Sequence, residues 1–213
     1  MSLDKILLIS KELSIWLHQY TNEAVFYNVS DREKWAICLW QQALDIEDGI
    51  GVLLESNLPG ASLALARPLL ECYVRGVWLL NAATDDQIEK FLSGENKYYS
   101  EFSISKLAKD IGNDAETGGA WINGIIDAHI KVLHDLTHGG TSHILTRCFS
   151  DTVEPSYPED NLISLVQLGI EVKIRSGAII LARMEKDEAL NLLGEKAEKI
   201  RNSFQVICPD VSK

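Results

Sequence analysis

The chain has 213 residues, of which 46% are hydrophobic, and its formal net charge at pH 7 is −11. This length and composition predict one globular domain with a packed core and exclude wholesale disorder. An acidic surface repels phosphates, and no run of Lys or Arg offsets it, so neither a nucleic acid nor an anionic membrane is expected as a partner.

Helical periodicity extends over most of the chain. Apolar residues recur every three or four positions, with turn-forming residues between the runs. The segments with this pattern are 4–20, 31–56, 59–81, 85–92, 96–111, 121–136, 161–184 and 186–206. We expect a short helix or an irregular segment over residues 142–149. The two prolines in 150–158 predict a loop there. No stretch alternates as strands do, so we expect an all-α irregular bundle of about eight helices, forming a single domain over residues 1–213.

Two local signals refine the helix boundaries. Ser30 and Glu33 have the spacing of a capping box, which predicts that the second helix starts at Asp31. Pro68 lies inside the third predicted helix and removes one backbone hydrogen bond there. It therefore either bends this helix or separates two helices.

The cysteines and the N-terminus bear on the compartment. The four cysteines form no CxxC motif, and Cys38 and Cys72 lie in apolar helical runs, where a buried free thiol is expected. The N-terminal apolar run is too short for a signal peptide, and no uncharged run approaches the length that spans a bilayer. These features predict a soluble cytoplasmic protein without a membrane partner.

Three charges share one face of the predicted 59–81 helix. Arg67, Glu71 and Arg75 are spaced four residues apart, and apolar residues surround them, so the helix is expected to be central. One interpretation is a buried ion network that fixes how helices pack. The second is a pocket in which the arginines bind an anionic group while Glu71 orients them or acts as a base. The third is a fully solvated stripe of charges. Trp78 either lies over the Arg75 guanidinium or packs in the core.

Four of the five histidines lie between positions 129 and 143. His134 and His138 are four residues apart near a helix end, a spacing that can chelate a metal, although the glutamate of a HExxH motif is missing. Three residues are candidates for a third ligand: Asp127, Glu71 and His143. The pair could equally cap the helix end, or form part of a catalytic site without a metal. No cofactor is predicted.

These motifs resemble a family of uncharacterised bacterial all-helical proteins. The resemblance is carried by RPLLECYVRGVWLL, with Arg67, Glu71, Arg75 and Trp78, and by the later HGG turn at His138; it also includes Gly139 and the downstream Arg147. It is clearest over 60–149 and implies no activity. The chain is more distantly similar to HEPN-type helical domains, many of which are ribonucleases marked by an Arg four to six residues before a His. Here the basic residue before His138 is Lys131, so such activity requires the fold to bring Arg67 or Arg75 beside His138.

Besides a metal protein that uses His134 and His138, two functions follow as hypotheses. The first is a scaffold or interaction protein without catalysis, assembled as a homodimer or another homo-oligomer. The alternative is a protein that handles a small molecule, nucleotide or RNA, as a HEPN-like ribonuclease or toxin would. Its catalytic candidates are Arg67, Glu71, Arg75 and His138. Its ligand-binding candidates are Arg67, Arg75, Trp78, His138 and Arg147.

Overall fold

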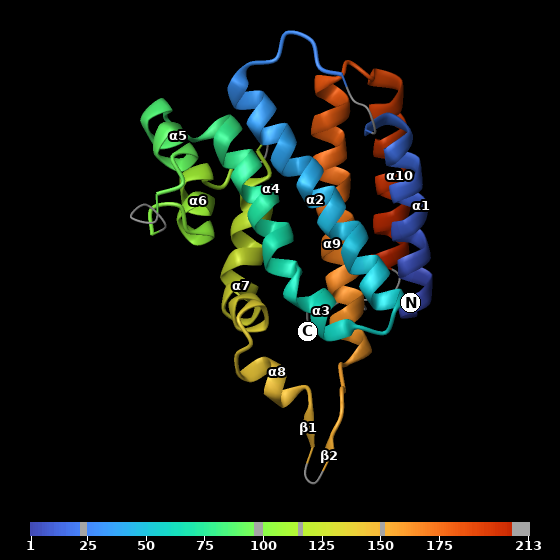
Figure 1. Ribbon diagram of the computed structural model, residues 1–213. Coiled ribbons are helices and arrows are strands. Elements are labelled where there is room, and N and C mark those ends of the chain that lie inside the picture. Colours follow the sequence, from blue (N-terminus) through green and yellow to red (C-terminus); the bar gives the residue numbers. More distant parts are fainter. Residues whose placement is uncertain (22–24, 96–99, 115–116, 150–151, 206–213) are drawn as a thin grey trace, which may run out of the picture.

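The structure is a computed structural model that describes residues 1–21, 25–95, 100–114, 117–149 and 152–205. Within these residues, ten helices and two two-residue strands follow one another along the chain (Figure 1). They are α1 (Leu3–Thr21), α2 (Asp31–Glu55), α3 (Pro59–Ala64), α4 (Ala66–Asn81), α5 (Asp85–Leu92), α6 (Ile104–Ile111), α7 (Gly119–Thr137), α8 (Thr141–Leu145), β1 (Cys148–Phe149), β2 (Thr152–Val153), α9 (Glu159–Arg183) and α10 (Asp187–Gln205). The prediction of an all-α bundle in one domain is confirmed.

The helices are arranged around α2, α4 and α9. Helix α2 packs against α4 on one side and α9 on another, while α1 and α10 pack against α9. Helices α6 and α7 pack against α4, and α5 lies beside α6 at one edge (Figure 1). None of the helices in the described ranges is both long and apolar enough to cross a membrane.

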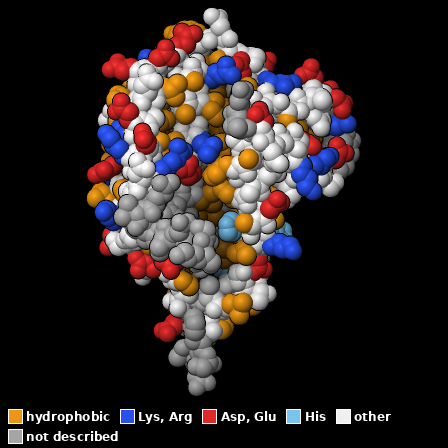
Figure 2. Space-filling view, turned by 180° about the vertical axis from the view of Figure 1, so that it is seen from behind, with side chains coloured by type: hydrophobic (Ala, Val, Ile, Leu, Met, Phe, Trp, Pro, Cys, Tyr) orange, Lys and Arg blue, Asp and Glu red, His pale blue; other side chains and the backbone are white. Residues whose placement is uncertain are grey.

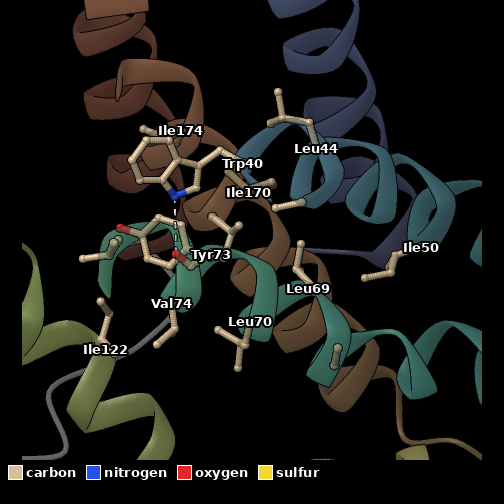
Figure 3. Close-up of a cluster of buried hydrophobic side chains, with 14 of the residues drawn as sticks. Trp40, Leu44, Ile50, Leu69, Leu70, Tyr73, Val74, Ile122, Ile170 and Ile174 are labelled. Carbon is tan, nitrogen blue, oxygen red and sulfur yellow. Dashed lines mark hydrogen bonds between the residues drawn. The ribbon is translucent and has the colours of Figure 1, made fainter. Parts of the chain in front are cut away.

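The core is built on the apolar face of α4. Nine of its sixteen residues are buried, which confirms that this helix is central. Trp40 of α2 lies against it, and its indole N–H donates to the carbonyl of Tyr73 at 3.3 Å (Figure 3). Gly76 permits this approach, because a Cβ at that position would lie only 2.5 Å from Trp40 Nε1. A residue without a side chain is therefore needed where α2 and α4 cross.

The predicted capping box is confirmed at the start of α2. The Ser30 side chain accepts a hydrogen bond from the Glu33 backbone N–H, and the Glu33 carboxylate accepts from the Ser30 N–H at 2.8 Å. The two bonds satisfy backbone donors that have no partner within the helix. The hydrogen bonds that the Glu33 carboxylate accepts from the Ser30 N–H and the Ser30 hydroxyl lower the pKa of Glu33.

Of the two alternatives for Pro68, the structure shows a division into two helices, since the chain breaks at Leu65 between α3 and α4. Pro68 explains the break: it has no N–H to donate to the carbonyl of Ala64, four residues earlier. It lies instead in the first turn of α4, where the amide would have no helical partner. Thr137 of α7 donates its hydroxyl to the freed Ala64 carbonyl at 3.3 Å.

Three predictions are corrected. Helix α6 begins at Ile104 rather than in 96–103; residues 96–99 lie outside the described ranges. The 142–158 region contains an antiparallel pairing of β1 with β2, in a hairpin too short for alternation to reveal. Cys38 is exposed rather than buried, and Cys72 is half-buried, which raises the pKa of its thiol. Cys38 lies within an apolar stretch of the sequence, but its side chain is on the outward face of α2.

Candidate functional site

The three charged residues of α4 form a linked network. Glu71 accepts a hydrogen bond from Arg67 Nε at 2.7 Å through Oε1, and its Oε2 lies 3.0 Å from Arg75 Nη2. Each of the three side chains keeps 19–28% of its surface exposed. One carboxylate thus fixes two guanidinium groups on a half-buried helix face, as the four-residue spacing predicts.

Helix α7 brings two histidines to the same point. Arg67 Nη1 contacts His134 Nδ1 and lies 3.4 Å from His138 Nε2, and the two imidazole centroids are 4.5 Å apart. Because a guanidinium only donates, the His134 Nδ1 atom must accept, which requires a lone pair on that nitrogen. The structure therefore joins His138, which is 71 positions from Arg67 in sequence, to the Arg67–Glu71–Arg75 network of α4 in one cluster.

The break between α3 and α4 positions this cluster. The single hydroxyl proton of Thr137 is shared between the Ala64 carbonyl at 3.3 Å and the Leu133 carbonyl of its own helix at 2.8 Å, so Thr137 links the end of α7 to Ala64. Arg67 is the second residue of α4, immediately after the break, and His138 is the residue that follows α7. The backbone interruption at Pro68 thus places an arginine and a histidine at adjoining helix ends.

A cavity of about 500 Å³ opens beside the cluster. Its polar wall contains three cationic side chains, Arg67, Arg75 and Lys90, and two carboxylates, Glu71 and Glu95. Its apolar lining residues are Pro68, Phe91, Phe102 and Ile104, and Ser103, Thr137 and His138 also line it. The arrangement suits a molecule with an anionic group on an apolar body.

Trp78 lies in the core behind this cavity. It is fully buried, and its ring packs against Phe91 and Phe102 with centroids 5.8 and 5.5 Å away. It is not among the described residues that line the cavity. Of the two alternatives for Trp78, the structure favours core packing, which supports the apolar wall from behind.

The residues after α7 turn away from the cluster. His143 Nε2 lies 2.5 Å from the Leu136 carbonyl, and Asp135 caps α8 by accepting from the Thr141 N–H at 3.1 Å and the Ser142 N–H at 2.5 Å. Hydrogen bonds from Ser142 and Thr141 lower the pKa of Asp135. Arg147 is exposed and lies over Gly60 of α3, so the structure does not bring it to Arg67.

The histidine pair forms no larger metal-ligand set within the described ranges. No group of three or more His, Cys, Asp and Glu side chains in them could hold a metal ion. The point that both imidazoles face is occupied by the Arg67 guanidinium. Of the candidate third ligands, Glu71 binds the arginines, His143 binds a carbonyl, and Asp127 is exposed.

A second polar cluster, which the sequence analysis missed, joins α1, α2 and α9. Lys173 of α9 is buried and contacts Glu47, and its Nζ lies 3.1 Å from Asp48 Oδ1. The hydroxyl of Ser10 donates to Glu47 Oε1 at 2.5 Å and accepts from Lys173 at 3.2 Å. A lysine on the buried face of an apolar helix was the available signal, because such a charge needs a partner.

Burial and charge act in opposite directions on these two carboxylates. Burial raises the pKa of Glu47, and attraction to Lys173 offsets only part of this effect. Partial burial also opposes ionisation of Asp48, but Lys173 and the hydrogen bonds from Ser14 and His18 outweigh it and lower the pKa of Asp48. The His18 imidazole lies 2.7 Å from the Asp48 carboxylate, at the outer end of the cluster.

The fold and site define an all-α bundle with a cavity lined by arginine, glutamate and histidine side chains. A family model described as a family of unknown function, DUF6988, matches residues 40–209, and the chain belongs to this family. The match agrees with the expected membership of an uncharacterised family, and the similarity to HEPN-type domains stays a prediction. No curated protein and no solved structure matches the chain significantly.

Proposed function

We propose that the cavity beside α4 binds a small anionic molecule, whose carboxylate or phosphate group is held by Arg67 and Arg75. The observation that carries this proposal is that two guanidinium groups and His138 converge on one solvent-accessible cavity of about 500 Å³. Guanidinium groups present planar pairs of donors that match carboxylate and phosphate oxygens. The volume lies within the range of small-molecule sites.

The charges of the cavity support an anionic ligand. Three cationic side chains face two carboxylates there, although the whole chain has a net charge of −11. Glu71 holds both arginines in place before a ligand arrives, which reduces the entropy lost on binding.

A purely architectural role predicts that the Arg67–Glu71–Arg75 network is dry and fully paired. The network lines an open cavity instead, which favours ligand binding over a purely architectural role. Assembly as a homo-oligomer stays part of the proposal. It is supported by the exposed apolar residues Leu8, Ile15 and Val52 on α1 and α2, and sedimentation of the purified chain tests it.

A cytoplasmic location also remains part of the proposal. The thiols of Cys38 and Cys148 are free and exposed. Exposed free thiols persist in the reducing cytosol and are oxidised more readily outside it. Fractionation of cells that express the chain tests this location.

A second candidate function is hydrolysis of a phosphate ester, favoured by the 3.4 Å distance between Arg67 Nη1 and His138 Nε2. An imidazole can transfer a proton while an adjacent guanidinium stabilises charge on the phosphoryl oxygens. Incubation with nucleoside monophosphates and with a short single-stranded RNA tests this activity, which His138→Ala should abolish. The acidic surface disfavours the RNA substrate.

Calorimetric titration with benzoate, inorganic phosphate and a nucleoside monophosphate tests the binding proposal. We expect saturable binding of at least one probe. Arg75→Gln should weaken this binding at least tenfold, because the ligand then loses the hydrogen bonds of one charged guanidinium group. Arg183→Gln is the matched control, since Arg183 forms an ion pair with Glu33 at 2.9 Å outside the cavity. The proposal is wrong if no probe binds, or if the control loses as much affinity as Arg75→Gln.

A further inference from the structure

A second cavity lies between α7 and α9, on the opposite side of α7 from the arginine cluster. Both helices pack against α3 and α4, and the space between them is a trough of about 620 Å³. Figure 2, which shows the molecule from behind, has hydrophobic side chains gathered in a hollow between these two helices. None of the residues considered for the anion-binding function lines this trough.

The trough is mainly apolar. Leu63 of α3 and Ala66 of α4 lie at its floor, Ile125 and Leu136 line the α7 wall, and Leu168 lines the α9 wall. At its rim, Val132 and Leu145 keep 52% and 68% of their surface exposed. A cavity with an apolar floor and apolar residues at its rim gains free energy when a nonpolar molecule covers them.

The trough is also elongated. Its lining on α9 runs from Asn161 to Glu171, ten residues along one helix, which corresponds to about 15 Å at about 1.5 Å per residue. On α7 the lining runs over an even longer stretch, from Trp121 to Leu136. This shape matches a linear chain better than a compact ring.

The two ends of the trough differ in their polar groups. At the Trp121 end, the Glu171 carboxylate is already held by Arg201 through contacts of 2.6 and 2.8 Å, and Arg175 stacks over the Trp121 ring at 4.4 Å. This end therefore has its charges paired. The opposite end is lined by Tyr157, Asn161 and the hydroxyl-bearing side chains of Ser142 and Thr146.

The Tyr157 end contains an unsatisfied donor beside a cation. The Tyr157 hydroxyl is buried and has no hydrogen-bond partner among the described residues, which is an unfavourable state for a polar group. An ideal Cβ at Gly60 would lie 2.6 Å from this hydroxyl and 3.2 Å from Arg147 Nη2, so both groups lie against Gly60 at the end of the trough that Tyr157 lines. A carboxylate accepts from a hydroxyl and a guanidinium together.

We propose that this trough binds a single-chain aliphatic carboxylate, with its carboxylate at Tyr157 and Arg147 and its hydrocarbon chain directed toward Trp121. The proposal gives Arg147 a ligand-binding role at a site separate from Arg67. It does not depend on anion binding beside α4.

Titration of the full chain with saturated carboxylates of 10 to 18 carbons, below their micelle concentrations, tests this proposal. We expect one molecule per chain and about a fourfold gain in affinity per added methylene, from about 0.8 kcal/mol per buried CH₂. The gain should stop once the hydrocarbon fills the trough. An affinity that rises through the whole series without a plateau, or binding that does not saturate, would overturn the proposal.

Paired variants separate the trough from other apolar surfaces. Val132→Glu should weaken binding of the C16 carboxylate at least tenfold, whereas Val52→Glu, at a similarly exposed valine on α2, should not change it. Arg147→Gln should weaken the C16 carboxylate but leave the C16 alcohol unchanged, with Arg183→Gln as the control. Equal losses in the valine pair, or equal effects of Arg147→Gln on acid and alcohol, would contradict the assigned site. Benzoate should not compete, since it is expected beside α4.

Discussion

Lys173 and Glu47 form an ion pair at the centre of the bundle, with only 1% and 2% of their side chains exposed. The pair connects α9 to α2, and Ser10 extends it to α1 by bonding to both side chains. Gly169 permits the contact, because a Cβ there would lie 2.8 Å from Glu47 Cγ. A buried pair of this kind contributes little net stability, yet removing one partner strands the other charge.

Lys173→Met should therefore destabilise the protein by about 3–5 kcal/mol, because Glu47 then has no cation inside the bundle. Urea unfolding followed by circular dichroism measures this loss. The double variant Lys173→Met with Glu47→Leu should recover most of it, since no buried charge remains. Lys11→Met is the matched control: Lys11 pairs with Glu55 at 2.9 Å on the surface, so its loss should be at most about 1 kcal/mol. Similar losses for the two single variants would contradict the assigned role of burial.

Asp48 should make the stability of the protein fall on acidification. Its pKa in the folded state is below the ordinary value of 3.8, so the folded state binds a proton less readily than the unfolded chain. The resulting stabilisation is complete above the unfolded value and is lost as the pH falls through the folded one. Asp48→Asn removes it, so the stability difference between wild type and variant should shrink below about pH 4. Urea titrations between pH 3 and 7 measure this difference, and a constant difference would contradict the prediction.

Much of the fold was predictable because most helices carry their own local signals. The capping box at Ser30 and the apolar periodicity placed α1, α2, α9 and α10 within two residues of their ends. The split at Leu65 was left open in sequence, because whether Pro68 bends a helix or divides it depends on a tertiary partner. That partner is Thr137, which satisfies the carbonyl freed at Ala64.

The arrangement of the site residues on α4 could be predicted from the sequence, whereas the position of the site residue contributed by α7 could not. The i, i+4 spacing of Arg67, Glu71 and Arg75 determines their ion pairs within one helix, whereas the approach of His138 depends on how α7 packs. Lys173 was missed because periodicity identifies the apolar residues of a helix and does not reveal which polar residue shares their face. The role of Trp78 was also a question of tertiary packing.

Gly76→Ala should destabilise the protein, because the added methyl group would overlap the Trp40 indole, whose nearest atoms lie 2.5–3.0 Å from the ideal Cβ position. Overpacking of this kind costs about 1–3 kcal/mol. Gly194→Ala in α10 is the matched control, since nothing lies within 4 Å of its ideal Cβ. A helical alanine in open space should stabilise by about 0.5–1 kcal/mol. Thermal unfolding of both variants should show a lower melting temperature for Gly76→Ala and a higher one for Gly194→Ala. Destabilisation by Gly194→Ala would refute the packing argument.

Removing Arg67 should turn the histidine pair into a weak metal site. His134 Nδ1 and His138 Nε2 both face Arg67 Nη1, so the guanidinium nitrogen occupies the point at which a cation shared by the two imidazoles would sit. The wild-type protein, purified without a histidine tag, should show no specific Zn²⁺ binding by calorimetry, because a positive charge already fills that point. Arg67→Ala should bind one Zn²⁺ per chain through the two imidazoles and water. Arg67→Ala with His138→Ala should lose that binding. Zn²⁺ binding by the wild type that equals or exceeds that of Arg67→Ala would show that the guanidinium does not block the pair.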